Sequence, residues 1–256
     1  MNTPREELGS LFDLDGRTAI VTGGASGLGR EIAYGLSAFG AAVVVADVDV
    51  PGAEATVDEL DGDALAVEAD VTDRDSLSRL RKRTLHAFGS YEVVFNVPGT
   101  NTRVPALELP EARWLEILDL NLSGVFRSAT VLGEPLVEQG HGSVVNMASA
   151  LGLVANPNQS AYAASKGGVV QLTKVLAAEW APDVRVNAIA PGYVKTPLVR
   201  EAMADETWYE EMRELHLLSR FADPSEVVGA AVYLASEASS FVTGSVLSVD
   251  GGWTAR

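Results

Sequence analysis

Short runs of apolar residues alternate with longer segments in which apolar residues recur every three or four positions. The short runs indicate buried strands, and the longer repeat indicates amphipathic helices. The pattern predicts seven strands, at 17–22, 42–47, 64–69, 92–96, 143–148, 184–189 and 245–249. Between them it predicts helices at 28–39, 49–60, 73–88, 109–137, 161–180 and 224–235.

Strands that alternate with helices are typical of a parallel sheet covered by helices on both faces. Right-handed crossovers then give the α/β Rossmann-type, doubly wound arrangement, which binds ligands outside the carboxyl ends of its strands. No linker, repeat or break in composition divides the chain, so we expect one domain over 1–256, with an N-terminal extension at 1–13.

The segment 196–220 differs from the other helical segments because it carries bulky apolar side chains that no strand pattern accounts for, including Met203, Trp208 and Tyr209. One interpretation is a lid over the substrate. The other is an ordinary amphipathic surface helix, and the pattern alone does not separate them.

Composition narrows the possible functions. The formal net charge of −16 disfavours nucleic acid as a partner, since phosphates select clustered Lys and Arg. This net charge is compatible with two interpretations, adaptation to a salty cytoplasm and an ordinary acidic surface. No cysteine is present, which excludes disulfides and thiolate chemistry. The acidic N-terminus does not resemble a signal peptide and no apolar run has the length of a membrane span, so we expect a cytoplasmic protein.

The three histidines do not form a catalytic or metal-binding pattern. His86, His141 and His216 are widely separated, without the spacing of metal ligands or of a Ser-His-acid triad. We therefore expect no metal. His216 falls within the 196–220 segment, where substrate contact is one interpretation and a structural role the other.

A glycine-rich stretch follows the first predicted strand and opens the first predicted helix. It contains Gly23, Ser26, Gly27, Leu28 and Gly29. Glycines at such a turn let the backbone approach a pyrophosphate, and the helix N-terminus supplies N–H donors and a partial positive charge. In this position the stretch predicts dinucleotide binding.

Asp47 ends the second predicted strand, 18 residues after Gly29. A carboxylate there accepts hydrogen bonds from both ribose hydroxyls of NAD and repels the 2′-phosphate of NADP. No Lys or Arg lies within 22–29 or directly after Asp47 to offset the repulsion. The sequence predicts NAD as the cofactor.

Tyr162 and Lys166 lie four residues apart in a predicted helix, so their side chains share one face. A nearby cation favours the phenolate and lowers the pKa of a tyrosine from about 10 towards the working range. Ser149, thirteen residues before Tyr162, is placed to donate a hydrogen bond to a substrate oxygen. Alone, this spacing is weak evidence, because most such pairs are solvated neighbours on a helix.

Together these motifs resemble the short-chain dehydrogenase/reductase family from about residue 14 to 253. The resemblance rests on the order and spacing of several short motifs along the chain: 22–29, Asp70-Val71, Asn121, Ser149, Tyr162 with Lys166, and Pro191-Gly192 to Thr196. It implies reversible hydride transfer between NAD and a secondary alcohol. It also implies a homotetramer, formed through the helices at 109–137 and 161–180 and the C-terminal segment 245–256.

The resemblance implies four catalytic residues. Tyr162 would be the general acid and base, and Ser149 would polarise the substrate oxygen. Lys166 would bind the nicotinamide ribose and lower the pKa of the phenol, and Asn121 would hold a water in a proton path to solvent.

It also implies a set of binding residues. Towards the cofactor these are Asp70 and Val71 at the adenine, Asn96 and Gly99 in the cleft, Tyr162 and Lys166, and Pro191, Gly192, Val194 and Thr196 at the nicotinamide end. Towards the substrate they are Ser149, Tyr162, Gly192 and Trp208. One departure from the family stands out, because Val97-Pro98 occupies the place where the family has Asn-Ala, and proline removes an N–H donor.

The segments 176–180, 190–193 and 250–253 are similar to those of enzymes that oxidise polyols, sugars or sugar acids. Arg103, near the expected cleft mouth, either contacts a substrate carboxylate or is an exposed loop residue. The competing functions are a 3-oxoacyl-carrier-protein reductase and a hydroxysteroid or hydroxyketone dehydrogenase. A third, more distant alternative is a non-catalytic NAD-binding regulator.

Overall fold

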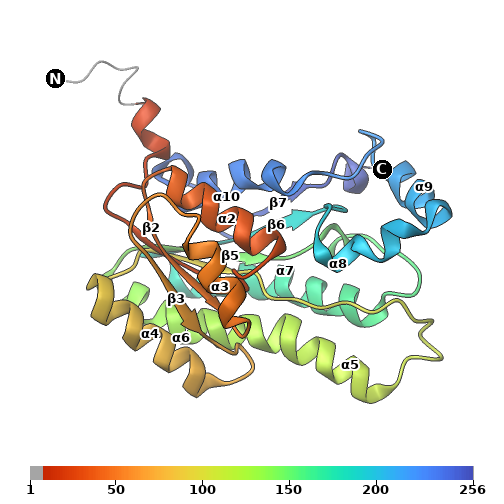
Figure 1. Cartoon of the computed structure of the whole chain (residues 1–256), viewed down its shortest axis with the longest axis horizontal. Helices are drawn as coiled ribbons and strands as arrows, with labels where there is room; N and C mark the ends of the chain where they lie inside the picture. The colour runs from red at the N-terminus through yellow and green to blue at the C-terminus, as the bar shows by residue number, and fades with distance from the viewer. Residues whose placement is uncertain (1–7, 256) are drawn as a thin grey trace.

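The computed structural model describes residues 8–255. All seven predicted strands form, and they pair in parallel in one sheet of order β3-β2-β1-β4-β5-β6-β7 (Figure 1). The strands are β1 (Thr18–Thr22), β2 (Ala42–Asp47), β3 (Ala64–Glu68), β4 (Val93–Asn96), β5 (Gly142–Met147), β6 (Val184–Pro191) and β7 (Val246–Val249). The order reverses between β1 and β4, as in the predicted Rossmann-type fold.

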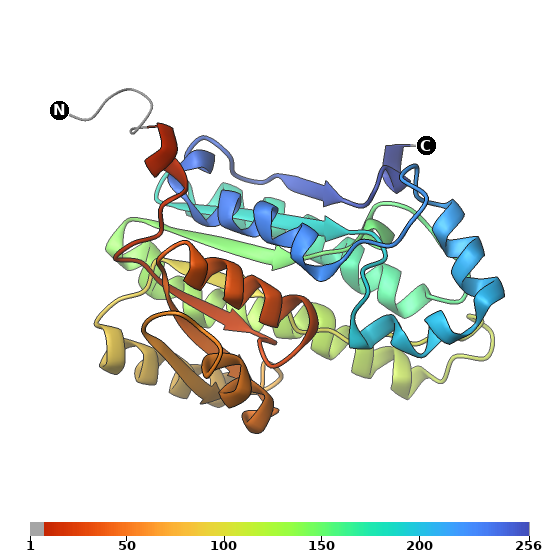
Figure 2. The same cartoon turned by 45° about the horizontal axis from the view of Figure 1, so that its top comes forward.

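Helices cover both faces of the sheet (Figure 2). One face is covered by α2 (Gly27–Ala38), α3 (Val50–Val57) and α10 (Val228–Ala235), and the other by α4 (Arg74–Phe88), α6 (Gly124–Gln139) and α7 (Ser160–Trp180). Within residues 8–255, no helix is both long and apolar enough to cross a membrane.

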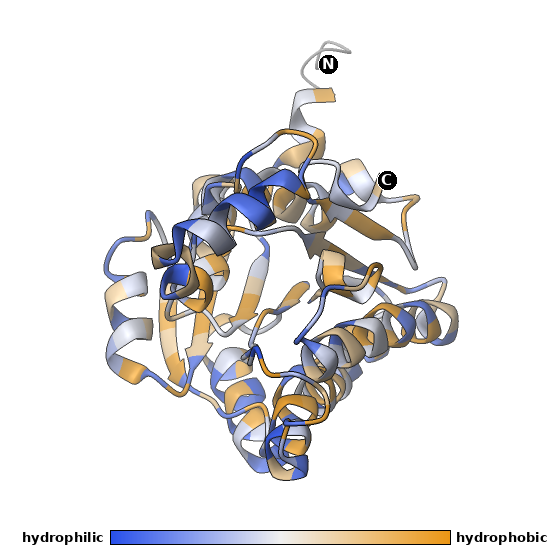
Figure 3. Ribbon diagram, turned by 90° about the vertical axis from the view of Figure 1, so that its right-hand side faces the viewer, coloured by the Kyte–Doolittle hydropathy of each residue, from blue (hydrophilic) through white to orange (hydrophobic). Residues whose placement is uncertain are grey.

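Successive side chains of a central strand serve two separate cores. Val43 and Val45 pack into the cluster with α2 and α10, whereas Val44 packs into the cluster with α4 and α6. Successive residues of a strand point to opposite faces, so a strand buried on both sides is apolar at every position. Figure 3 shows these strands as the most hydrophobic part of the ribbon.

The predicted helix at 109–137 is interrupted in the structure. It divides into α5 (Glu111–Leu118), a π-helical turn (Asp119–Ser123) and α6. Such a turn inserts one extra residue and is frequent at functional sites. Here it contains Asn121, one of the residues assigned to chemistry.

Other predicted boundaries shift by a few residues. The helix predicted at 49–60 is shorter, and the one at 224–235 begins with a 3-10 turn (Pro224–Val227). The 196–220 segment forms α8 (Pro197–Arg200), a 3-10 turn (Ala202–Ala204) and α9 (Glu206–Glu214) rather than one helix. Asp205 explains the break, since its side chain caps α9 by accepting from the Trp208 backbone. Of the N-terminal extension, 1–7 lie outside the described residues, and Ser10–Phe12 form a 3-10 turn.

Candidate active site

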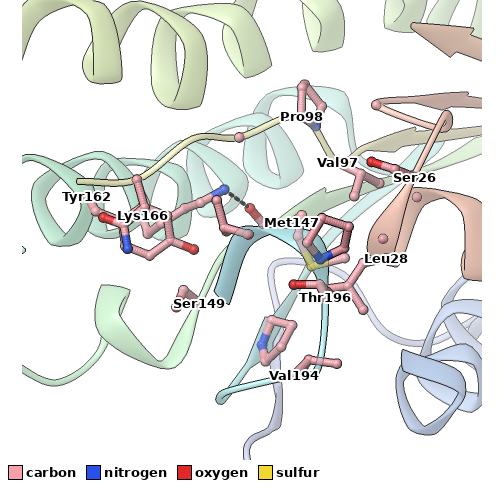
Figure 4. Close-up of a pocket in the computed structure, with 18 of the residues that line it drawn as sticks. Ser26, Leu28, Val97, Pro98, Met147, Ser149, Tyr162, Lys166, Val194 and Thr196 are labelled. Carbon is pink, nitrogen blue, oxygen red and sulfur yellow. Dashed lines mark hydrogen bonds between the residues drawn. The ribbon is translucent and has the colours of Figure 1, made fainter. Parts of the chain in front are cut away.

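A cavity of about 490 Å³ lies at the carboxyl ends of the strands. Its walls come from the segments that follow β1 to β6 and from α7 and α8, and Figure 4 shows the side chains that face it. Most residues predicted to bind a cofactor line this cavity: Gly23, Ser26, Gly27, Leu28, Gly29, Asp47, Asp70, Val71, Gly99, Tyr162, Lys166, Pro191, Gly192, Val194 and Thr196.

The glycine-rich stretch is a tight turn packed directly on the start of α2. Gly23 and Gly27 have φ of +75° and +54°, a region that favours glycine. A Cβ on Gly29 would lie 2.0 Å from the Gly23 carbonyl oxygen. Only glycine allows this packing, which leaves the N-terminus of α2 facing the cavity.

Two backbone N–H groups hold the side chain of Asp47 in place at the cavity wall. Its Oδ2 accepts a hydrogen bond from Ala25 N at 3.0 Å, and its Oδ1 accepts one from Asp49 N at 3.1 Å. Each oxygen keeps a second lone pair for a ligand. The carboxylate is therefore fixed at the end of β2 with acceptor capacity remaining.

Positive charge is scarce along the wall of this cavity. Lys166 is the one cationic side chain among its lining residues. Arg30 is close in sequence to the glycine-rich turn, but its Nη2 donates to Ala25 O at 2.7 Å and its Nε donates to Thr56 Oγ1 at 3.1 Å. A phosphate beside Asp47 would thus have a carboxylate as its neighbour and no lining cation near it.

Ser149, Tyr162 and Lys166 meet at the inner end of the cavity (Figure 4). The turn that carries Ser149 packs directly against α7. The approach is so close that a Cβ on Gly152 would be 2.7 Å from the Lys166 carbonyl oxygen. Ser149 Oγ accepts a hydrogen bond from Leu151 N at 3.2 Å, and the Tyr162 side chain lines the same wall of the cavity.

Lys166 is 2 % exposed, and its ammonium donates to the Met147 carbonyl oxygen at 2.7 Å. Burial lowers the pKa of Lys166 from 10.5 to about 8. The ammonium lies 5.8 Å from the centre of the Tyr162 ring. The buried ammonium of Lys166 thus links the middle of α7 to the end of β5.

The pKa of Tyr162 moves in the opposite direction from the one predicted. Burial raises it to about 12, a rise that the nearby Ser149 hydroxyl reduces and that Tyr193 increases. The prediction that Lys166 lowers this pKa is wrong for these side chains, because the ammonium points to the Met147 carbonyl rather than to the phenol oxygen.

Asn121 lies beside this group but does not line the cavity. Its Nδ2 donates to Thr100 O at 2.8 Å and to Ser165 Oγ at 3.2 Å, and its Oδ1 accepts from Thr100 N at 2.9 Å. The side chain therefore holds the loop after β4 against α7. A Cβ on Gly99 would lie between it and Lys166, 3.5 Å from Asn121 Oδ1 and 3.6 Å from Lys166 Nζ.

Two other predicted residues are also absent from the lining. Asn96 is fully buried, and its Nδ2 donates to Asn146 Oδ1 at 2.8 Å behind the cavity. Trp208 packs edge-on against Tyr193, with ring centres 5.3 Å apart. Asn96 thus supports the cleft from within the sheet, and Trp208 supports a residue that lines it.

The cavity is also lined by residues that were not assigned to the site from the sequence, among them Gln159, Tyr193 and Trp253. Tyr193 directly follows Gly192, which was a usable signal, whereas Gln159 lies in an irregular stretch before α7. His216 does not line this cavity. Its Nε2 accepts from Tyr193 N at 3.1 Å, so its role here is structural. Among residues 8–255, no group of three His, Asp or Glu side chains is arranged to hold a metal ion.

The fold and the cavity define a dinucleotide-dependent oxidoreductase. A family model described as enoyl-(acyl carrier protein) reductase matches residues 23–254. The chain belongs to the short-chain dehydrogenase/reductase family, as its motifs indicated. The residues present fit a nicotinamide dinucleotide, since a glycine turn, a carboxylate at the end of β2 and one buried cation face the same cavity.

Curated relatives cover nearly the whole chain. A galactitol 2-dehydrogenase (L-tagatose-forming) of Cereibacter sphaeroides is 38% identical, over 96% of this chain and 98% of its own. A D-threitol dehydrogenase of Mycolicibacterium smegmatis is 40% identical, over 99% of this chain and 100% of its own. An NAD-dependent glycerol dehydrogenase of Listeria innocua is 36% identical, over 96% of both chains.

One solved structure has the same fold as this chain, and it contains NADP rather than the predicted NAD. A gluconate 5-dehydrogenase from Burkholderia cenocepacia, in complex with NADP and tartrate, superposes with a TM-score of 0.92. It is 32% identical and covers 96% of this chain and 98% of its own. Similar proteins thus include both NAD-dependent and NADP-bound members.

The buried ammonium gives a testable dependence of stability on pH. Between pH 8 and 10.5 the unfolded chain holds a proton on Lys166 that the folded chain has released, so folding stability rises with pH in this window. Relative to a Lys166→Met variant, the wild type should gain about 3 kcal/mol across it. Urea unfolding of both proteins at pH 7.5 and 10.5, without added nucleotide, measures the difference.

Lys174→Met is the matched control, because Lys174 lies on the exposed side of the same helix. This variant retains Lys166, so its stability should rise with pH by as much as that of the wild type. Equal pH dependence in the wild type and the Lys166 variant would contradict the assignment of a buried, destabilised ammonium.

Proposed function

We propose that the protein is an NAD-dependent dehydrogenase that interconverts a secondary alcohol and a ketone, with a polyol, sugar or sugar acid as substrate. The observation that carries this proposal is that Ser149, Tyr162, Lys166 and the glycine-rich turn all line one cavity. Its polyol-oxidising relatives support the substrate class.

In this proposal Tyr162 moves the proton of the substrate hydroxyl, and Ser149 holds the substrate oxygen. The nicotinamide supplies the hydride acceptor when it is bound. Burial keeps Tyr162 protonated at neutral pH, which suits an acid that donates to a carbonyl. For the oxidation of an alcohol the phenolate is needed, so oxidation gains from a rise in pH that increases its fraction.

Lys166 and Asn121 take supporting roles in the proposal. Lys166 offers its ammonium to the ribose next to the nicotinamide, and its flexible stem lets it turn from the Met147 carbonyl towards the cavity. Asn121 holds the loop after β4 through Thr100 and α7 through Ser165. We assign Asn121 a positioning role. We also propose that it holds a water in a proton path to solvent, as the family resemblance implies.

NAD is favoured over NADP by the surroundings of Asp47. The carboxylate is fixed by two backbone donors, and no lining cation near it offsets the charge of a 2′-phosphate. Asp70 and Val71 line the adjoining wall, where the adenine is expected. The NAD-dependent glycerol dehydrogenase supports this choice, and the NADP-bound gluconate 5-dehydrogenase makes it necessary to test.

Two competing functions are less well supported. The matched family model is described by an acyl-carrier-protein reductase activity, but a net charge of −16 does not favour docking of an acidic carrier protein. A non-catalytic regulator is disfavoured because Ser149, Tyr162 and Lys166 converge on one cavity.

Replacing Tyr162 by phenylalanine should remove the proton-transfer group and leave the cavity otherwise intact. Alcohol oxidation should fall by about 10²- to 10⁴-fold. NADH affinity, followed by nucleotide fluorescence, should stay close to that of the wild type. Tyr34→Phe is the control, because its hydroxyl bonds Glu59 away from the cavity and activity should persist. A Tyr162 variant with more than a tenth of wild-type activity would refute this role.

The cofactor choice is tested by comparing kcat/KM for NAD and NADP. We expect at least tenfold preference for NAD, and Asp47→Asn should reduce it at least tenfold by removing the negative charge. Asp49→Asn is the matched control, since that carboxylate caps α3 at Gly52 and does not line the cavity. A wild-type enzyme that prefers NADP tenfold would show that the assignment is wrong.

We also propose a homotetramer. Phe126 on α6 and Val175 on α7 are 45 % and 44 % exposed, which gives these helices apolar surface that the monomer does not cover. Analytical ultracentrifugation at micromolar concentration should show four copies, and a monomer would contradict the proposal.

A further inference from the structure

A polar cluster adjoins the substrate end of the cavity and is incompletely hydrogen-bonded. It consists of Arg103, Asn156, Gln159 and Tyr193, with Trp208 packed against it. Within residues 8–255, side-chain nitrogens of Gln159 and Arg103 are shut off from solvent and have no hydrogen-bond partner. Unsatisfied buried donors are rare in folded proteins and require an explanation.

Gln159 is the part of the cluster that faces the cavity. The side chain is 2 % exposed, and its Oε1 accepts from the Tyr193 hydroxyl at 3.3 Å. The Tyr193 hydroxyl in turn accepts from Asn156 Nδ2 at 3.2 Å. This chain fixes the orientation of the Gln159 amide, and Nε2 remains as a donor without an acceptor.

Arg103 supplies the charge. Its guanidinium lies 4.3 Å above the centre of the Trp208 ring, an arrangement that uses the face of the group and leaves its N–H groups in plane. Nε and Nη2 are both without a partner, and none of the ion pairs within residues 8–255 includes this arginine. The cation also lies near the Tyr193 hydroxyl, and with Asn156 it offsets part of the rise that burial causes in the pKa of that group.

The loop that carries Arg103 is tied down on both sides of it. Val104 N donates to Asn158 O at 2.8 Å, and Arg113 Nη2 donates to Asn101 O at 3.3 Å. These hydrogen bonds fix the loop on both sides of Arg103 and so hold its guanidinium in position. Asn101 and Gln159 both line the cavity, so the tied segment borders the space that a substrate enters.

A partly buried cation without a counter-ion is costly, because burial removes water that nothing else replaces. The missing partner must accept several hydrogen bonds and carry negative charge. A carboxylate meets both needs, since it matches the planar fork of a guanidinium with two oxygens and can also accept from an amide. A neutral hydroxyl would satisfy one donor and leave the charge uncompensated.

We propose that Arg103 and Gln159 bind the carboxylate of the substrate, which is therefore a hydroxy acid, such as a sugar acid, rather than a neutral polyol. The proposal rests on the proposed function and specifies its substrate class. Trp208 holds the guanidinium in place through its ring face and contacts no substrate itself. Arg103 and Gln159 are specificity-determining residues, distinct from the Ser149 and Tyr162 pair that handles the reacting hydroxyl.

Matched pairs of compounds test the proposal, each pair with the same carbon chain ending in a carboxylate or in a hydroxymethyl group. We would measure kcat/KM with NAD for D-gluconate against D-glucitol, D-threonate against D-threitol, and cis-4-hydroxycyclohexanecarboxylate against cis-4-(hydroxymethyl)cyclohexanol. The carboxylate of the best pair should be preferred at least tenfold. Arg103→Met should reduce its kcat/KM about 10- to 100-fold, with less than threefold change for the alcohol and for NADH affinity.

Two further variants separate charge recognition from packing. Gln159→Leu leaves the contact of Arg103 with Trp208 in place and should also lower kcat/KM for the carboxylate selectively. Arg213→Met removes a cation from α9 that pairs with Glu210 at the surface, and should change neither member of a pair. Circular dichroism and NADH binding confirm that each variant is folded.

Three outcomes would overturn the proposal. The alcohol member of each pair could be the better substrate. Arg103→Met could affect both members equally, which would mean that the arginine only supports Trp208. Finally, NADH could bind while no compound of any pair is oxidised, and that result would remove the proposed function as well, whereas the first two leave it intact.

Discussion

Alternate side chains of the central strands pack into two separate apolar clusters, one on each face of the sheet. Since helices fill both faces, polar chemistry has room only along the edge where the strands end. The register between neighbouring strands fixes which loops meet there. Thr22 pairs with Ala46 on one side and with Asn96 on the other, so the glycine-rich turn, Asp47 and the loop after β4 start from one line.

Burial also sets the electrostatics of the inner end of the cavity. It lowers the pKa of Lys166 and raises that of Tyr162, so it favours the neutral form of each side chain. The spacing of four residues brings the two side chains together but does not determine the direction in which the ammonium points. The ammonium points to the Met147 carbonyl, to which it donates a hydrogen bond. Gly152 allows the turn with Ser149 to lie against the same helix.

The sequence was sufficient for the fold because buried parallel strands are apolar at every position. It was also sufficient for most of the cavity, since residues that end strands or open helices lie at one edge. Asn96 shows the limit: it ends β4, yet its side chain points into the sheet towards Asn146. The orphaned donors of Gln159 and the stacking of Arg103 depend on irregular loops, which carry no periodicity from which their contacts could be predicted.

The Asp47 carboxylate also braces two neighbouring segments, since its Oδ2 accepts from Ala25 N in the glycine-rich turn and its Oδ1 accepts from Asp49 N before α3. With Asp47 in its proposed role, cofactor preference and the shape of the glycine-rich turn are inherited together. A lineage that changes its cofactor by mutating this position alone loses a brace of the turn in the same step. Replacements elsewhere, which supply new acceptors for Ala25 and Asp49, must precede or accompany the switch, and this makes the preference slow to drift.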